Sequence, residues 1–201
     1  MINVAVVDDQ AMVRAGLVAL LNLESDLHVV GEGETGQDAI EVAQLPGLDV
    51  LLLDVEMPQM DGLEALERIR GSACKVAILM LTTFARPGWV TRALAGGASG
   101  FLVKDQQAAQ LAEAIRRVHA GMRVVDPDLA ARSLGLGQNP LTAREKDVLR
   151  AALGGGTSAQ VARQVGLSEG TVRNHVTSAM AKTGGSSRMD AARRAHNNGW
   201  L

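Results

Sequence analysis

Polar residues that could carry out chemistry stand at the ends of four short apolar runs. The clearest is the carboxylate that ends Val50-Leu51-Leu52-Leu53, and the five residues are Asp8, Asp9, Asp54, Thr82 and Lys104. Continuous apolar runs of this length are typical of strands buried on both faces of a parallel sheet. Each of these residues taken alone is also typical of a turn cap or a surface charge, so the interpretation depends on where the strands place them.

Parallel strands would bring the five side chains together, because the carboxyl ends of such strands meet at one edge of the sheet, where ligands bind. Three carboxylates at close range repel one another and would not all stay ionised unaided. A hard divalent cation resolves this conflict, and Mg²⁺ suits a site of carboxylate and phosphate oxygens. We therefore expect Asp54 to attack a phosphoryl group and form an aspartyl phosphate, with Mg²⁺ and Lys104 neutralising the developing charge.

The elements that must position these residues alternate along the first part of the chain. Apolar runs predict five strands, at 2–7, 27–31, 48–53, 76–81 and 100–103. Helical spacing of apolar residues predicts five helices, at 12–23, 36–44, 62–70, 87–95 and 107–120. This alternation favours an α/β fold with a doubly wound, five-stranded parallel sheet.

The composition excludes several classes of protein. The single cysteine, Cys74, allows no disulfide within the chain and no thiolate metal site, and it fits a reducing compartment. The chain has no GxxxxGK[ST] loop, and no GxGxxG turn follows the first strand, so the pattern does not indicate a nucleotide site. The N-terminus lacks the basic segment of a signal peptide, and no apolar run could span a bilayer. We expect a cytoplasmic protein without membrane insertion.

Charge divides the chain into two parts. From residue 139 to the C-terminus nine Lys and Arg residues stand against four Asp and Glu residues, whereas the rest has eleven against eighteen. An acidic front and a basic back favour two domains, the second of which binds a polyanion. We place the domains at 1–121 and 140–201. The linker at 122–139 is expected to be a flexible tether with a turn of helix at 128–133.

The second domain carries the signals of four short helices. The expected N-caps are Thr142 for 143–153, Ser158 for 159–165, Ser168 for 169–183, and Ser187 for a helix that ends near 198. The two middle helices are joined by a turn that contains Gly166. They predict a helix-turn-helix within a small, four-helix, all-α domain.

Residues 2–120 resemble the receiver domain of two-component response regulators, which has a flavodoxin-like fold. The matching residues are Asp8-Asp9, Asp54 followed by Met57-Pro58 and Asp61-Gly62, Thr82, and Gly100-Phe101-Leu102-Val103-Lys104. The resemblance implies that a sensor histidine kinase donates the phosphoryl group to Asp54. It also implies a switch made by Thr82 and Phe101, and a Mg²⁺ site made by Asp8, Asp9, Asp54 and the backbone carbonyl of Glu56. Asp105 stands where many receivers have Pro, so a cis bond after Lys104 is less expected.

Residues 140–201 resemble the LuxR-type effector domain of NarL and FixJ regulators. The matching residues are Leu141-Thr142-x-Arg144-Glu145, Ser168-x-x-Thr171-Val172-Arg173-Asn174-His175-Val176, and Lys182. The resemblance implies that a homodimer binds double-stranded DNA. Base contacts are expected from Arg173, Asn174 and Thr177, and phosphate contacts from Arg144, Ser168, Thr171 and Lys182. Thr183-Gly184-Gly185 replace bulkier residues of the family, which predicts a looser junction before the fourth helix.

Two residues are expected to flank the phosphoryl group. Glu56 and Phe84 lie two places after Asp54 and Thr82. Our hypothesis is that Phe84 shields the aspartyl phosphate from water and slows its hydrolysis. The stretch 81–88, with 22–24 and 199–200, further resembles one subfamily, the regulators of membrane-lipid desaturation.

Together these patterns indicate a transcription regulator and not an enzyme in the usual sense. Phosphorylation of Asp54 is expected to shift the receiver toward a dimer, and the dimer to bind promoter DNA. One alternative is a Mg²⁺-dependent aspartyl-phosphate hydrolase with a basic tail, although the DxDxT signature is absent at Asp54. The other is a regulator that binds DNA regardless of phosphate, although Thr82 and Lys104 argue against it.

Overall fold

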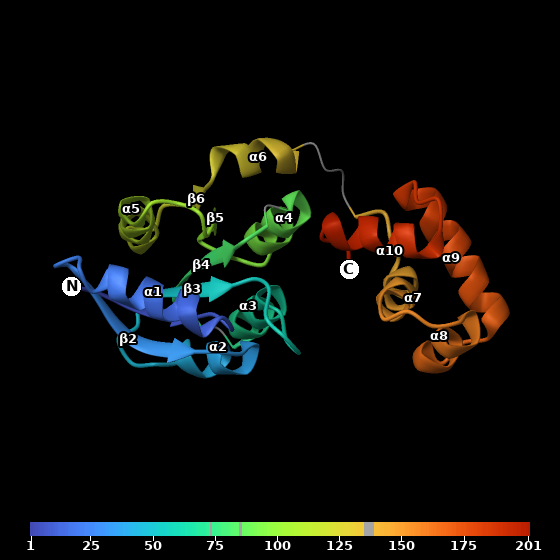
Figure 1. Cartoon of the computed structure of the whole chain (residues 1–201), viewed down its shortest axis with the longest axis horizontal. Helices are drawn as coiled ribbons and strands as arrows, with labels where there is room; N and C mark the ends of the chain where they lie inside the picture. Colours follow the sequence, from blue (N-terminus) through green and yellow to red (C-terminus); the bar gives the residue numbers. More distant parts are fainter. Residues whose placement is uncertain (73, 85, 135–138) are drawn as a thin grey trace. The chain divides into compact units, whose positions relative to one another are not determined.

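A computed structural model of the chain describes residues 1–72, 74–84, 86–134 and 139–201 (Figure 1). Residues 1–85 and 90–130 belong to one compact unit, and residues 86–89 and 131–201 belong to a second. The elements of the first unit follow the expected alternation: β1 (Ile2–Val7), α1 (Ala11–Leu21), β2 (Leu27–Gly33), α2 (Gly36–Val42), β3 (Val50–Asp54), α3 (Gly62–Gly71), β4 (Ala77–Thr82), α4 (Pro87–Ala95), β5 (Gly100–Val103), α5 (Ala108–His119) and β6 (Val124–Val125).

The strands form one parallel sheet in the order β2-β1-β3-β4-β5-β6, which confirms the expected doubly wound α/β fold. The winding reverses between β1 and β3, and such a reversal opens a crevice at the carboxyl ends of the strands. The register pairs Val7 with Leu53 and Thr82 with Val103, so β1 and β3 end together, as do β4 and β5. The sheet therefore brings the residues after these strands to one edge.

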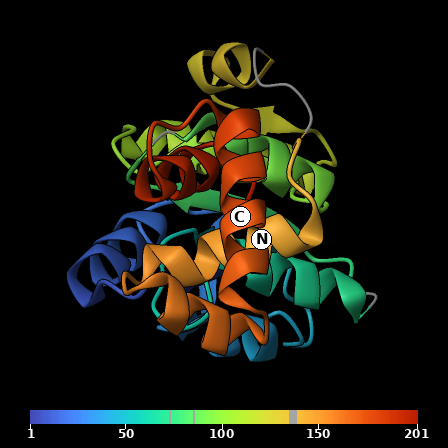
Figure 2. The ribbon, with the colours of Figure 1, turned by 90° about the vertical axis from the view of Figure 1, so that its right-hand side faces the viewer.

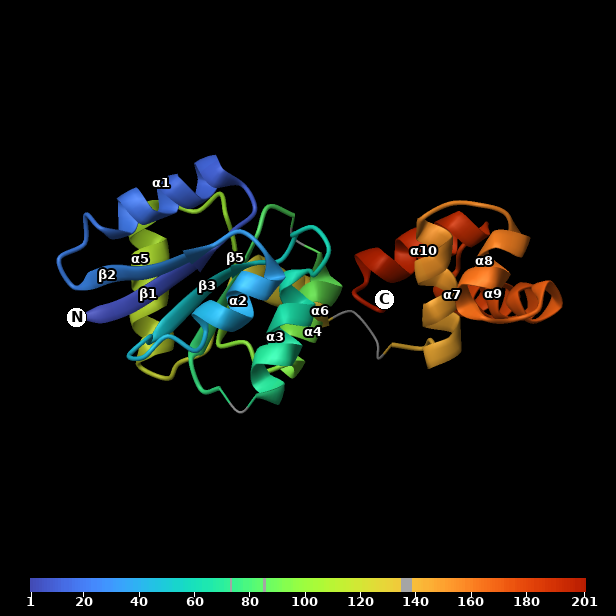
Figure 3. The ribbon, with the colours of Figure 1, turned by 90° about the horizontal axis from the view of Figure 1, so that it is seen from below.

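Helices cover both faces of the sheet, which is why its central strands are apolar throughout (Figure 3). Alternate strand residues such as Val6, Leu52 and Leu79 form one core with α1 and α5. The intervening residues, such as Leu53 and Met80, point to the other face and are equally buried, and α2 and α3 pack side by side. Each fully buried side chain of this kind contributes about 1.5–3 kcal/mol. The strands are thereby held rigidly where they carry the site.

The sheet has six strands, so the expected number of five is wrong by one short strand. In β6, Val124 and Val125 pair with Gly100 and Phe101 of β5. Two residues are too few to show a periodic pattern in the sequence. They form a strand because they pair with the edge of β5. The helix expected near 128–133 is present as α6 (Pro127–Leu134). The Gly-rich part of the expected tether, 135–138, lies outside the described residues.

The second unit consists of α7 (Ala143–Leu153), α8 (Ser158–Val165), α9 (Glu169–Thr183) and α10 (Arg188–Asn197), as the sequence predicted. Figure 2 shows α9 crossing α7. Val148, Val161 and Val172 join α7, α8 and α9 in one small core, while Leu149 and Ala179 belong to a second that includes α10. In the part of the chain that the structure describes, no helix is both long and apolar enough to cross a membrane.

Three of the four expected caps of these helices are confirmed. The side chains of Thr142, Ser168 and Ser187 each accept a hydrogen bond from the backbone N–H three residues on. The cap of α8 is Thr157 and not Ser158, because Thr157 forms a reciprocal capping box with Gln160. The helix consequently begins one residue earlier than expected.

The junction between α9 and α10 is closely packed, which contradicts the expected looseness. Gly184 adopts a left-handed conformation (φ 67°) and ends α9. A Cβ at Gly185 would lie 2.6 Å from the backbone of Ala191, so only glycine lets α10 approach this closely. The small residues at this junction therefore let α10 pack directly against the backbone that follows α9, where bulkier side chains would not fit.

Candidate functional site

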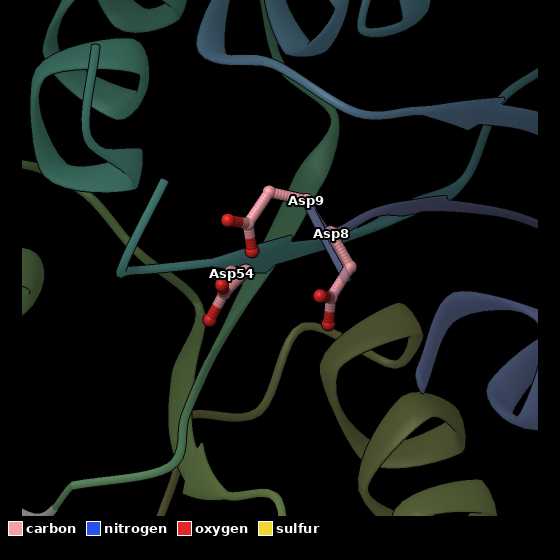
Figure 4. Close-up of side chains that lie close together, drawn as sticks. All are labelled: Asp8, Asp9 and Asp54. Atoms are coloured by element: carbon pink, nitrogen blue, oxygen red, sulfur yellow. The ribbon is translucent and has the colours of Figure 1, made fainter. Parts of the chain in front are cut away.

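Three carboxylates gather where β1 and β3 end, as the sequence predicted (Figure 4). One oxygen from each of Asp8, Asp9 and Asp54 lies within 4.8 Å of the others. The cause is the register, because Val7 and Leu53 are paired and the residues that follow them must be neighbours. Asp8 and Asp54 are almost completely buried, whereas Asp9 is exposed. The cluster therefore opens to solvent on the side of Asp9.

Lys104 brings a positive charge to the same edge. Its Nζ lies 2.7 Å from Asp8 Oδ2 and 3.0 Å from Asp54 Oδ1. The backbone N–H of Lys104 donates to the carbonyl of Thr82, which continues the pairing of β4 with β5 and fixes the base of the side chain. Among the described residues no peptide bond is cis, the Lys104–Asp105 bond included.

Burial and the ion pairs act in opposite directions on the titration of the site. Burial raises the pKa of Asp54 to about 6, despite the lowering effects of Lys104 and of the backbone N–H of Glu56. For Lys104, burial alone would lower the pKa, but its contacts with Asp8 and Asp54 outweigh burial and raise it. The positive charge near Asp54 is thus too small to offset the cost of burying its ionised form.

The donor set fits a hard cation. Asp54 Oδ2 is buried and, among the described residues, has neither a hydrogen bond of standard geometry nor an ion pair. Buried carboxylate oxygens are almost always satisfied, so this one calls for a further partner. The three acids offer only oxygen ligands, as Mg²⁺ requires, and Glu56 lies half-buried in the turn after β3. A divalent cation would supply the positive charge that Asp54 lacks.

Asp8 is held from several sides, and part of this support could not be foreseen from the sequence. Its Oδ1 accepts a hydrogen bond from the backbone N–H of Gln10, at 3.0 Å. The guanidinium of Arg14 donates to the carbonyl of Asp8 at 2.7 Å and pairs with Glu34, also at 2.7 Å. Arg14 lies on α1 and Glu34 follows β2, so no local spacing links them. Arg14 keeps the Asp8-Asp9 turn in place.

Thr82 and Phe101, the expected switch, are both fully buried. The hydroxyl of Thr82 donates to the carbonyl of Phe84 at 3.0 Å and accepts from the Phe84 N–H at 3.1 Å. These bonds tie the hydroxyl to the chain that leads into α4. Phe84 is 59% exposed.

The second unit presents a polar surface along α9. Arg173, Asn174 and Thr177 are all exposed, as expected, and the hydroxyl of Thr177 donates to the carbonyl of Arg173. Ser168 caps the helix, and its hydroxyl lies 2.8 Å from that of Thr171. The N-terminal turn of α9 is therefore capped by Ser168, which accepts from the backbone N–H of Thr171.

Two cations that the sequence assigned to phosphate contacts lie in different settings. Arg144 is exposed at the start of α7. The Nζ of Lys182 instead lies 2.7 Å from Oε2 of the buried Glu145, within the unit itself. No local spacing could predict this pair, because its members are 37 residues apart.

Comparison with known proteins assigns both units. Residues 4–116 match the family model described as the response regulator receiver domain. Residues 139–195 match the model described as bacterial regulatory proteins of the luxR family. The two matches cover the elements that carry the acidic cluster and the exposed face of α9.

Full-length relatives carry both units in one chain. The chain is 42% identical to the transcriptional regulatory protein DesR of Bacillus subtilis over the whole of both chains, and DesR is the regulator to which stretch 81–88 pointed. It is 36% identical to the transcriptional regulatory protein UhpA of Escherichia coli, again over both complete chains. A crystal structure of the response regulator ChrA, of a heme-sensing two-component system, matches with a TM-score of 0.58 and 28% identity, covering 100% of this chain and 98% of ChrA.

Proposed function

The chain belongs to the response regulators that join a receiver domain to a luxR-family DNA-binding domain, and on that basis we propose that Asp54 is its phosphoryl acceptor. The protein is a DNA-binding transcription regulator activated by phosphorylation, and not an enzyme. The observation that carries the assignment of Asp54 is its position. It is the buried carboxylate at the end of the central strand β3, paired with Lys104 on one oxygen only.

The proposed reaction is a transfer from the phosphohistidine of a sensor kinase. An oxygen of the Asp54 carboxylate attacks phosphorus, the new O–P bond forms, and the P–N bond to the imidazole breaks. The electron pair of the broken bond stays on the imidazole nitrogen, which takes up a proton. Lys104, 3.0 Å from Asp54, stabilises the charge that builds on the phosphoryl oxygens.

We assign the cation of this site to Mg²⁺, held by Asp8, Asp9 and Asp54 together with the backbone carbonyl of Glu56. The support is the oxygen-only donor set and the unsatisfied Asp54 Oδ2. When bound, the ion would neutralise the carboxylates and the phosphoryl oxygens. This chain's own residues orient the acceptor, since Arg14 and Gln10 fix Asp8 and Lys104 bridges Asp8 to Asp54.

The proposed switch consists of Thr82 and Phe101. In the present structure the Thr82 hydroxyl is satisfied by the backbone of Phe84. A phosphoryl group on Asp54 would offer this hydroxyl a charged acceptor, and charge-assisted hydrogen bonds are stronger than neutral ones. Movement of the hydroxyl would release the segment that leads into α4 and repack Phe101, which shifts the receiver between two conformations.

The proposed output is binding of double-stranded DNA by a homodimer, with α9 as the recognition helix. Arg173, Asn174 and Thr177 lie on its exposed face and would meet base edges in the major groove. Ser168, Thr171 and Arg144 lie at helix N-termini, where backbone N–H groups and positive charge suit phosphates. Lys182, expected among the phosphate contacts, is paired with Glu145 instead. Since the kinase and promoter must both reach the chain, we place it in the cytoplasm.

The experiment that tests this function compares wild type with Asp54→Asn, each with and without acetyl phosphate and Mg²⁺. The readouts are the mass of the intact protein and binding to a duplex that phosphorylated wild type selects from a random-sequence pool. Wild type is expected to gain one phosphoryl group and about 5- to 150-fold in affinity, as for coupling energies of about 1–3 kcal/mol. Asp54→Asn should gain neither. Equal binding with and without the donor would instead favour a regulator that ignores phosphate.

A further inference from the structure

Lys182 differs from the other cations expected to contact DNA, because its charge is already paired inside the domain. Its Nζ lies 2.7 Å from Oε2 and 2.9 Å from Oε1 of Glu145. The Glu145 side chain is only 4% exposed, and that of Lys182 is 32% exposed. The ammonium is therefore drawn toward α7.

Glu145 in turn gathers four contacts onto one carboxylate. Beside the two from Lys182, Oε1 accepts from the hydroxyl of Ser178 at 2.6 Å, and Oε2 accepts from the backbone N–H of Thr142 at 2.7 Å. Ser178 and Lys182 are four residues apart, on the same side of α9. The buried Glu145 carboxylate thus takes part in the N-terminal capping box of α7 and also binds α9 through Ser178 and Lys182. We call Glu145, Ser178 and Lys182 the clamp.

The titration of Glu145 agrees with this geometry. Burial alone would raise its pKa, but the hydrogen bonds from Lys182, Ser178 and Thr142 outweigh burial and lower it to about 2. The carboxylate is therefore charged at neutral pH, and its attraction for Lys182 acts in a buried setting where salt screens it little.

Helix geometry places Arg173 opposite Lys182 of the clamp, whereas Asn174, four residues before Ser178, lies on the clamp's side of α9. Lys182 and Arg173 are nine residues apart, which at about 3.6 residues per turn is two and a half turns, so they project from opposite sides of α9. Fixing one side of the helix against α7 fixes the direction of the other. A small rotation of α9 would move Arg173 and Asn174 relative to the bases they are proposed to contact.

We propose that Lys182 is a positioning residue that fixes the recognition helix through Glu145, and that it is not a phosphate contact. This inference rests on the proposed DNA-binding function. To reach a phosphate, Lys182 would have to leave a buried carboxylate without its counter-charge, which is strongly unfavourable. A lysine that keeps its internal partner releases no DNA counter-ion when the protein binds.

The salt dependence of DNA binding tests the inference, because the slope of log K against log salt changes by about 0.9 for each phosphate contact. The measurement uses the full chain, phosphorylated with acetyl phosphate and Mg²⁺, and the duplex selected by wild type. Lys182→Met is compared with Arg144→Gln as the matched control at a proposed phosphate contact. We expect Arg144→Gln to lower the slope by about 0.9, whereas Lys182→Met leaves it unchanged within about 0.3.

The affinity for selected DNA should nevertheless fall by about tenfold in Lys182→Met, as in other coupled positions. Affinity for a scrambled duplex should fall much less, because misdirection of α9 affects base contacts only. Glu145→Gln should add little to the loss once Lys182 is replaced. If circular dichroism shows that Lys182→Met does not fold, the salt dependence is measured with Lys182→Gln instead. Its side chain can still donate a hydrogen bond to Glu145.

A slope lowered by about 0.9 in Lys182→Met, with equal losses on selected and scrambled duplexes, would overturn the inference and restore Lys182 as a phosphate contact. Additive losses in the Glu145→Gln, Lys182→Met double variant would also contradict it. Failure of wild type to bind any selected duplex would instead contradict the proposed function, so the two failures are distinguishable.

Discussion

Asp54 combines two requirements that conflict at the level of a single residue. A phosphoryl acceptor must be ionised, yet the side chain is buried and carries a pKa raised to about 6. Lys104 pairs with one of its oxygens, and its other oxygen has no ion pair among the described residues. The resulting carboxylate is costly to ionise in the absence of a cation, which makes it a strong ligand and a reactive acceptor.

This conflict predicts how stability varies with pH. Because the folded pKa of Asp54 is about 6 and the ordinary value 3.8, the folded state holds the proton more tightly between these values. The corresponding stability is present below pH 4 and lost as the pH rises through 6, a loss of about 3 kcal/mol. Asp54→Asn, which cannot ionise, should therefore be more stable than wild type at pH 8 without divalent cations. The advantage should vanish at pH 4, as measured by urea unfolding of the receiver domain.

The matched control is Asp105→Asn, which replaces an exposed acid next to Lys104 in sequence. Its stability relative to wild type should be the same at both pH values. An advantage of Asp54→Asn that does not change with pH would show that ionisation of Asp54 costs the fold nothing.

Phe84 gives a second prediction at the scale of a residue. Phe84 is 59% exposed and follows Thr82 by two residues, with its backbone N–H bonded to the Thr82 hydroxyl, and we propose that its ring lies over the phosphoryl group. We expect Phe84→Ala to shorten the half-life of the phosphorylated chain several-fold, because water reaches phosphorus more easily. The decay is followed by mass spectrometry after removal of the donor. Met12→Ala, at another exposed apolar residue, should not change it, and an unchanged half-life in Phe84→Ala would refute the shielding.

At the scale of elements, the site depends on how closely α3 approaches the end of β3. A Cβ at Gly62 would lie 1.9 Å from the carbonyl oxygen of Asp54, where no side chain fits. Asp61 caps the helix at this point by accepting from the Glu64 N–H at 2.7 Å. The helix start thus fixes the strand end that carries the acceptor.

Replacement of Gly62 by Ala should therefore disturb both elements. We expect Gly62→Ala to destabilise the receiver domain by about 3 kcal/mol through overpacking, and to slow phosphorylation by acetyl phosphate. Gly16→Ala is the control, since nothing lies within 4 Å of a Cβ there and the position is inside α1. That change should stabilise the domain by about 0.5–1 kcal/mol in urea unfolding. A neutral Gly62→Ala would mean that α3 can move away without cost.

At the scale of the whole molecule, the two units carry different charges and different tasks. The acidic receiver holds the chemical site, and the basic second unit holds the surface for a polyanion. Communication between them requires that phosphorylation change an equilibrium that both units share, and dimerisation is the simplest such equilibrium. Two recognition helices can then bind half-sites about one helical turn apart.

Dimerisation is checked by sedimentation of the full chain. Acetyl phosphate with Mg²⁺ should increase the sedimentation coefficient of wild type from that of a monomer toward that of a dimer, and the change should reverse as the phosphate is lost. Asp54→Asn should remain unchanged under the same conditions. A wild type that is phosphorylated by mass yet stays monomeric would show that DNA binding is controlled in another way.

Sequence alone predicted the residues of the candidate site and the elements on which they lie. Apolar runs and their polar ends suffice to place Asp8, Asp54, Thr82 and Lys104 at one sheet edge, because parallel strands share their direction. Capping residues likewise sufficed for three of the four helix starts in the second unit. These signals are local or periodic, so they can be read from neighbouring residues.

Only the tertiary structure decided the contacts between distant residues. The strand β6 exists because β5 has an open edge, and Arg14 supports Asp8 from another element. Lys182 changed from an expected phosphate contact to the partner of Glu145, 37 residues away. Such pairs depend on which side chains the fold places next to each other, and the spacing of residues along the sequence does not predict that. The fold supplies the burial of Asp54 and its pairing with Lys104, on which its proposed role as acceptor rests, and residues adjacent in sequence do not supply either.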